Sequence, residues 1–315
     1  MKEYSNHISC YEDLKTTYNE TRAGFISIAL EKNKRATPYV EEAKVLRSRI
    51  KKITNANDLI TIQNIRNGLI AAAGISDKAA RHLGVDGCND AIKEFIKNFL
   101  LPAGDNFRDE LVFRFLLTKG DSLGGSMRNI VGALAKRKLN RTIVAALRLS
   151  DKEFHWFDKK QWREANEIDF EDLDEAKGLY WENDKGMPRS LYYDITVPLI
   201  RNNIDVILLN EQMDNDLKSA ILVPENFIAL GELKGGIDPA GADEHWKTAK
   251  TAIDRIVNGF SNANLTPKIF YIGAAIENKM ASEIYDNLEQ GYINNAANLT
   301  KDEHMTSITE WLVGL

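Results

Sequence analysis

The 315-residue chain has little of several features that mark common protein classes. It has only two cysteines, Cys10 and Cys88, too few for a disulfide framework and without the paired spacing of a zinc site. We therefore expect a reducing, cytoplasmic setting. No apolar run approaches the roughly 20 residues that a membrane span needs. Residues 1–7 lack the apolar stretch of a secretion signal, so we expect neither a membrane anchor nor export.

The common phosphate-binding motifs are also missing. No GxGxxG follows an expected strand, and no Walker loop is present. The glycine-rich segment 120–126 is expected to open a helix whose N–H groups could meet a phosphate, but no strand precedes it. We therefore do not assign it as a nucleotide-binding loop. The formal net charge of −5 argues against a protein that coats nucleic acid non-specifically, without excluding an enzyme that acts on DNA.

The first half of the chain has helical periodicity. Expected helices cover residues 11–34, a segment opened by Thr37-Pro38, and residues 57–73, 90–100, 107–119 and 127–149. Basic residues gather at three places along them: Lys32, Lys34 and Arg35; Arg47, Arg49, Lys51 and Lys52; and Lys136, Arg137, Lys138 and Arg141. Each cluster alone is typical of a solvated helix face. Three of them in an acidic chain favour at least one surface for an anionic partner.

The second half changes to a mixed pattern. Residues 151–184 are rich in acids and are expected to form a surface excursion or extended loop. Strands are expected at 179–181, 190–197, 204–209, 227–234 and 268–276, and helices at 242–260, 280–290 and 301–312. This order predicts an α/β fold with a mixed sheet and helices on both sides, preceded by a mainly helical N-terminal region. We place the division between the two at residues 120 and 121.

Glu232-Leu233-Lys234 ends the apolar strand that begins at Phe227. Successive side chains on a strand alternate faces, so Glu232 and Lys234 should point the same way while Leu233 points into the protein. Two glycines follow and leave room for a ligand. The alternative is a surface Glu–Lys pair on an edge strand, since such triplets are frequent by chance.

Asp205 would join this pair if its strand lies beside that of Glu232. Two carboxylates and a backbone carbonyl, for which we expect Leu233, suit Mg²⁺, which binds oxygen ligands and keeps much of its water. Lys234 could then hold the attacking water or offset phosphate charge, as in phosphodiester hydrolysis. His245, expected in the first turn of the next helix, could accept a proton from that water. A structural role is equally open for His245.

Several segments of the chain resemble the AvaI/BsoBI family of type II restriction endonucleases, within the PD-(D/E)XK nuclease superfamily. The similar segments are residues 14–18, 22–26, 30–35, 74–78, 120–125, 127–130, 231–249 and 297–301. They extend from about residue 14 to the C-terminus, and the closer resemblance is to the AvaI branch. The chain departs from the superfamily in one respect, because Ile204-Asp205 replaces its usual Pro-Asp pair.

The resemblance implies a homodimer that needs Mg²⁺ and cuts double-stranded DNA at the degenerate palindrome CYCGRG, after the first C. It implies a nuclease core with Asp205, Glu232, Lys234 and His245 as catalytic residues. The helical region would embrace DNA. The residues expected to contact DNA are Lys78, Asp238, Lys32, Lys34, Arg35 and Arg128.

Two other functions remain open from the residues alone. The chain could bind DNA in a sequence-specific way without cutting it, with Glu232 and Lys234 forming only a structural pair. It could also hydrolyse sugars, with Asp205 and Glu232 as acid and base. A sugar hydrolase of that kind needs no metal, so insensitivity to EDTA would favour it.

Overall fold

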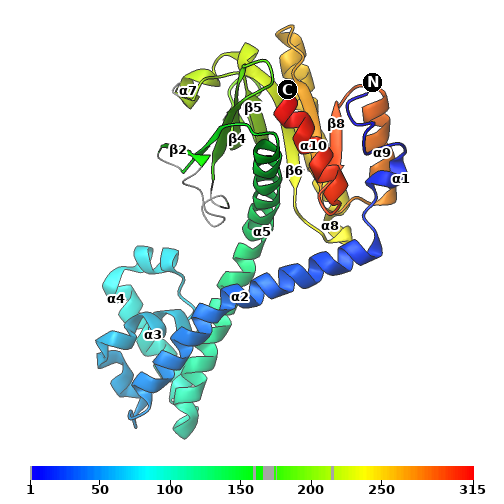
Figure 1. Ribbon diagram of the computed structural model, residues 1–315. Helices are drawn as coiled ribbons and strands as arrows, with labels where there is room; N and C mark the ends of the chain where they lie inside the picture. Colours follow the sequence, from blue (N-terminus) through cyan, green and yellow to red (C-terminus); the bar gives the residue numbers. More distant parts are fainter. Residues whose placement is uncertain (1, 159–160, 166–173, 175, 214–215) are drawn as a thin grey trace. The chain divides into compact units, whose positions relative to one another are not determined.

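An eight-stranded mixed sheet forms the centre of one of the two units into which the chain divides (Figure 1). The computed structural model describes residues 2–158, 161–165, 174, 176–213 and 216–315. The α/β unit comprises residues 1–26 and 129–315, and the helical unit comprises residues 27–128. The division therefore falls after residues 26 and 128, and the first residues of the chain belong with the sheet.

The sheet has the strand order β2-β1-β3-β4-β5-β6-β7-β8. The strands are β1 (Phe154–Phe157), β2 (Trp162–Glu164), β3 (Gly178–Glu182), β4 (Pro188–Val197), β5 (Asn202–Leu209), β6 (Phe227–Lys234), β7 (Lys268–Gly273) and β8 (Asn295–Asn298). Neighbours from β2 to β6 run antiparallel, whereas β6, β7 and β8 run parallel. Two short elements, α7 (Leu217–Ala220) and η6 (Pro224–Asn226), lie between β5 and β6. Strand β6 is therefore central and is buried on both faces.

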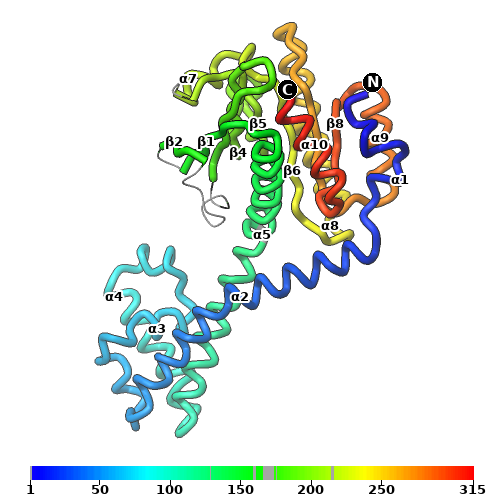
Figure 2. Tube along the Cα trace, viewed as in Figure 1, coloured from blue at the N-terminus to red at the C-terminus, as the bar shows by residue number. Residues whose placement is uncertain are grey.

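Helices cover the two faces of the sheet (Figures 1 and 2). On one face, α8 (Pro239–Asn262) and α9 (Asn278–Glu289) bury an apolar stripe, and Trp246 packs edge-on against Tyr271 at 5.1 Å between ring centroids. On the other face lie the C-terminal part of α5 (Phe107–Leu149) and α10 (Asp302–Gly314). Phe270 of β7 packs against Trp311 of α10 on that face. The expected class, a mixed α/β sheet with helices on both sides, is confirmed.

The N-terminal segment is tied to the parallel edge of the sheet. Helix α1 (Tyr11–Leu14) contacts α9, and the Tyr285 hydroxyl donates to the carbonyl of Ser9 at 2.9 Å. The Thr16 hydroxyl donates to the Ala274 carbonyl at 2.7 Å and accepts from the N–H of Ile276 at 2.9 Å. These bonds fix the point at which α2 (Tyr18–Ile50) begins.

The helical unit packs short helices between parts of α2 and α5. Its elements are η1 (Ala56–Thr61), η2 (Gln63–Ile65), α3 (Arg66–Ala72), α4 (Asp77–Phe95), the π-helical turn η3 (Ile96–Leu100) and η4 (Gly104–Asn106). Leu46, Leu59, Ile92, Leu100 and Leu111 are among the side chains of its apolar core. The helical character expected for this part of the chain is confirmed.

Several expected helix boundaries were wrong because tertiary packing overrides local breakers. Pro38 lies inside α2 and does not open a new helix. The glycine-rich segment 120–126 lies inside α5, so its N–H groups are used within the helix; Leu123 and Ile130 are buried around it. The helix expected at 57–73 is two 3₁₀ turns followed by α3, with Asn55 as the first cap.

The expected strands at 190–197, 204–209 and 227–234 correspond to β4, β5 and β6, and the later helices correspond to α8, α9 and α10. Strands β1, β2 and β8 were not expected. The first two lie in the acidic stretch 151–184, of which residues 159–160, 166–173 and 175 lie outside the described residues. In the part of the chain that the structure describes, no helix is both long and apolar enough to cross a membrane.

Candidate active site

Strands β5 and β6 bring Asp205, Glu232 and Lys234 together. The strands pair antiparallel with Val206 opposite Gly231, so Asp205 lies alongside Glu232 one residue further on. An oxygen of Asp205, Oδ2, accepts a hydrogen bond from the backbone N–H of Leu233 at 2.9 Å. This bond holds the carboxylate against the end of β6. The neighbouring position of the two strands, on which the sequence argument depended, is confirmed.

Lys234 bridges the two carboxylates. Its Nζ lies 2.7 Å from Asp205 Oδ2 and 2.7 Å from Glu232 Oε2. Burial works to lower the pKa of Lys234, but the charges of Glu232 and Asp205 outweigh it and the pKa is raised. The ammonium group therefore stays charged and offsets one of the two negative charges.

Glu232 is the most deeply buried member, with only 3% of its surface exposed. Burial, followed by repulsion from Asp205, raises its pKa to about 7. Leu233 is also buried, as expected from the sequence. Helix α8 covers the other face of β6, the one that carries Glu232, so Glu232 is buried as well.

The oxygen Oε1 of Glu232 is buried and has no hydrogen-bond partner. An unpaired buried carboxylate oxygen is costly, and a divalent cation is one group that would satisfy it. Among the described residues, no cluster of three or more His, Cys, Asp or Glu side chains could hold a metal ion. A cation here would therefore rest on two carboxylates, Asp205 and Glu232, together with backbone oxygen and water. The donor set, all oxygen with few protein ligands, fits Mg²⁺.

His245 lies in the second turn of α8, because that helix begins at Pro239 and not at residue 242. Its imidazole packs on the loop after β6: a Cβ atom at Gly236 would lie 2.5 Å from His245 Nε2. Gly236 therefore leaves the space that the imidazole fills. Within the described part of the chain, no hydrogen bond joins His245 to Asp205 or Glu232. The structure brings His245 to the loop beside the carboxylates and not onto them.

The loop from Gly235 to Asp238 is held from two sides. A Cβ at Gly235 would lie 2.7 Å from the carbonyl oxygen of Val131 on α5. A Cβ at Gly24 of α2 would lie 2.4 Å from Cγ1 of Ile237, which is buried. Sequence reasoning missed these contacts, since only the glycines themselves were visible as a signal.

The residues expected to contact DNA lie on both units. Asp238 is exposed and caps α8, accepting from the N–H of Ala240 at 3.0 Å. Lys78 is exposed in the first turn of α4 in the helical unit. Lys32 and Lys34 are exposed on α2, where Arg35 pairs with Glu31 at 2.7 Å. The side chain of Arg128 lies outside the described residues.

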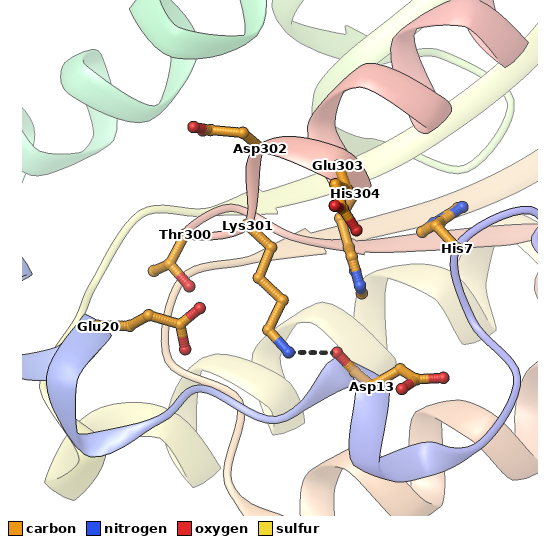
Figure 3. A pocket seen from close by; sticks show the side chains of 8 residues that line it. All are labelled: His7, Asp13, Glu20, Thr300, Lys301, Asp302, Glu303 and His304. Atoms are coloured by element: carbon orange, nitrogen blue, oxygen red, sulfur yellow. Dashed lines mark hydrogen bonds between the residues drawn. The ribbon is translucent and has the colours of Figure 1, made fainter.

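A separate cavity of about 510 Å³ lies at the start of α10 (Figure 3). It is lined by His7, Asp13, Glu20, Thr300, Lys301, Asp302, Glu303 and His304. Asp13 and Glu20 accept hydrogen bonds from nearby backbone N–H groups, and Lys301 donates to the carbonyl of Asp13 at 2.6 Å. Burial, followed by repulsion from His7 and Lys301, lowers the pKa of His304 to about 3. None of the three clustered site residues lines this cavity.

Two comparisons with known proteins identify the family of the chain. The restriction endonuclease BsobI family matches residues 4–315. The type II restriction enzyme BsoBI of Geobacillus stearothermophilus is 48% identical over 321 residues, which cover 100% of this chain and 99% of that enzyme. The type II restriction enzymes AvaI of Nostoc sp. and of Anabaena variabilis are each 48% identical over 314 residues, covering 99% of both chains.

The chain is therefore a nuclease of the restriction endonuclease class. More narrowly, it belongs to the AvaI/BsoBI family of type II restriction endonucleases. Its identity to the AvaI and BsoBI enzymes is the same, so the closer resemblance to the AvaI branch is not supported. The 48% identity to restriction enzymes over the whole chain also argues against the two alternatives, a non-catalytic DNA-binding protein and a sugar hydrolase.

Proposed function

We propose that this enzyme cuts double-stranded DNA at CYCGRG, after the first C of each strand, as a homodimer that requires Mg²⁺. Its α/β unit would be a PD-(D/E)XK core with Asp205, Glu232 and Lys234 as the active site. The observation that carries this proposal is the contact of these three side chains where the first half of β5 lies beside the end of β6. The family membership of the whole chain supports it.

The two carboxylates would hold the cation together with the backbone carbonyl of Leu233. Bound Mg²⁺ would stabilise charge on the scissile phosphate and polarise a water molecule. Glu232 offers the oxygen that lacks a partner, and Asp205 is oriented by the N–H of Leu233. Lys234, which bridges the carboxylates, would turn its ammonium group towards the attacking water and the phosphate.

His245 would accept the proton that the attacking water loses. A neutral imidazole can do this when it lies within hydrogen-bond reach of the water or of a second water between them. The support is its contact with Gly236, two residues after Lys234. The loop from Gly235 to Asp238 would then link base recognition to proton transfer, because Asp238 is proposed to contact bases and Gly236 contacts His245.

Base recognition would use Asp238 and Lys78, and phosphate contacts would come from Lys32, Lys34, Arg35 and Arg128. A purine at the R position can be A or G, and both present N7 as an acceptor in the major groove. A single lysine that donates to N7 would bind A and G alike, and we assign this contact to Lys78. A palindromic site matches a two-fold dimer. Phosphate contacts would position the duplex without reading it.

Digestion of a plasmid of known sequence with Mg²⁺, followed by mapping of the fragment ends, tests the proposal. We expect ends only at CYCGRG, and loss of cutting in EDTA. Asp205→Ala and Glu232→Ala should abolish cutting, while Asp286→Ala, which removes an exposed carboxylate on α9, should not. Ends at another sequence would refute the assigned site. Full cutting by either active-site variant would refute the assigned residues.

A further inference from the structure

Two buried oxygen atoms without partners lie on neighbouring strands of the active site. One is Oε1 of Glu232 on β6, and the other is the hydroxyl of Tyr271 on β7. Tyr271 is fully buried and Glu232 is nearly so. Burying an unsatisfied polar group is costly, so two of them on neighbouring strands require an explanation.

The sheet places both side chains on the same face. Strands β6 and β7 pair in parallel with Glu232 directly opposite Tyr271, and residues that pair in register project from the same side. The hydroxyl of Tyr271 extends towards the end of β7, where a Cβ at Gly273 would lie 2.5 Å from it. Glycine at position 273 therefore leaves the space that the hydroxyl occupies. Gly273 pairs with Lys234, so the hydroxyl lies at the same end of the strands as Lys234.

The ring of Tyr271 is fixed from the other side by α8. Trp246 packs edge-on against it, with a 76° angle between the ring planes, and the Trp246 Nε1–H donates to Glu283 at 2.8 Å. Trp246 directly follows His245 in the chain. The tyrosine ring therefore has little freedom, and its hydroxyl is held at one place beside the carboxylates.

A tyrosine hydroxyl carries its proton throughout the neutral pH range. A protonated hydroxyl is a donor, whereas an ionised carboxylate is only an acceptor. The two unpartnered atoms are therefore complementary: one offers a proton and the other offers lone pairs.

We propose that Tyr271 is a positioning residue for Glu232, whose Oε1 accepts a hydrogen bond from the tyrosine hydroxyl directly or through one buried water. The bond sets the orientation in which Glu232 presents its carboxylate to a divalent cation. This inference rests on the proposed active site. Groups that orient a metal ligand in this way change metal affinity by about 10- to 100-fold when they are removed.

Tyr271→Phe tests the proposal because it removes only the hydroxyl and keeps the ring against Trp246. Tyr193→Phe is the matched control: Tyr193 is also buried, and its hydroxyl donates to Asn140 at 2.6 Å on the opposite face of the sheet. Mg²⁺ affinity is measured by calorimetry without DNA, and the melting temperature is measured in EDTA. We expect Tyr271→Phe to bind Mg²⁺ at least about tenfold more weakly.

Mg²⁺ affinity, and not stability, should distinguish the two variants. Each loses one buried hydrogen bond and should melt lower than the wild type in EDTA, but only Tyr271→Phe should lose Mg²⁺ affinity, whereas Tyr193→Phe should keep it. General loosening of the fold would not produce this pattern. Unchanged Mg²⁺ affinity in Tyr271→Phe, or equal losses in both variants, would overturn the proposal.

Glu232→Gln separates this proposal from the active-site assignment on which it rests. If Glu232→Gln loses Mg²⁺ affinity and Tyr271→Phe does not, the active site stands and the role of Tyr271 is refuted. If Glu232→Gln binds Mg²⁺ and cuts DNA like the wild type, the active-site assignment fails, and the role of Tyr271 fails with it. Loss of affinity in both Glu232→Gln and Tyr271→Phe supports the two together.

Discussion

Glu232→Gln should stabilise the metal-free enzyme at neutral and alkaline pH. The glutamine keeps the shape of the protonated glutamate and removes the charge that burial and Asp205 oppose. A rise in the pKa of Glu232 from 4.5 to about 7 corresponds to about 3 kcal/mol of unfavourable free energy for the charged form. Most of the side chain is buried, so solvent screening reduces this value little.

The sign of the effect depends on pH. The folded protein binds the Glu232 proton more tightly than the unfolded chain, so the contribution of Glu232 to stability is fully present below pH 4.5. It is lost as the pH rises from 4.5 to about 7. The difference in unfolding free energy between Glu232→Gln and the wild type should therefore be near zero at pH 4.5 and should grow to as much as about 3 kcal/mol above pH 7.

Urea unfolding followed by tryptophan fluorescence in EDTA measures this difference. The five tryptophans lie between residues 156 and 311, so the signal reports on the α/β unit and not on the helical one. Asp286→Asn, at an exposed position on α9, serves as the control. A Glu232→Gln protein that is less stable than the wild type at pH 8, or a difference that does not change with pH, would refute the electrostatic reasoning.

Adding Mg²⁺ extends the same experiment to the cation. A ligand present at 100 times its dissociation constant stabilises the folded state by about 2.7 kcal/mol. Wild-type protein should gain this amount, whereas Glu232→Gln should gain much less because it has lost a charged ligand. The excess unfolding free energy of Glu232→Gln over the wild type should therefore shrink or change sign when Mg²⁺ is added.

Three further substitutions probe the loop and the DNA contacts. His245→Ala should lower the single-turnover cleavage rate far more than DNA affinity in a gel-shift assay; equal losses would indicate a structural role. Lys78→Ala should weaken binding or discrimination at the Y·R pair by about 1–3 kcal/mol, and an unchanged sequence preference in a binding competition would contradict that assignment. Gly24→Ala should slow cleavage, because the added methyl group would displace Ile237 and its loop. The double variant Gly24→Ala/Ile237→Ala should cleave faster than Gly24→Ala alone, because the smaller side chain at position 237 makes room for that methyl group. Wild-type cleavage by Gly24→Ala alone would show that the loop tolerates the shift.

The sequence predicted the parts of the fold in which local pattern and packing agree. Strands β5 and β6 are runs of apolar residues bounded by polar ones, and their limits were found to within two residues. Strand β8 was missed because Asn295 and Asn298 resemble loop residues. The structure buries both, and the Asn298 side chain donates to the carbonyl of Leu14, almost 300 residues away in the sequence.

The same contrast applies to the candidate site. The spacing of Glu232 and Lys234 placed them on one face of a strand, and this local inference holds. Their contact with Asp205 was expected only if β5 and β6 are neighbours, because local sequence does not determine the order of strands in a sheet. The contacts of Gly24 with Ile237 and of Gly236 with His245 depend on how α2, the loop and α8 meet in space. No periodicity predicts such meetings.

The continuity of α2 and α5 through the boundary between the units limits how this enzyme can change in length. Each residue of an α-helix turns the chain by about 100°. One residue inserted into α2 between Gly24 and the helical unit would rotate every later side chain of that helix by this angle, while Gly24 stayed against Ile237. Insertions and deletions should therefore accumulate in the loops of the helical unit and be rare in these two helices, where substitution is the accessible route of divergence.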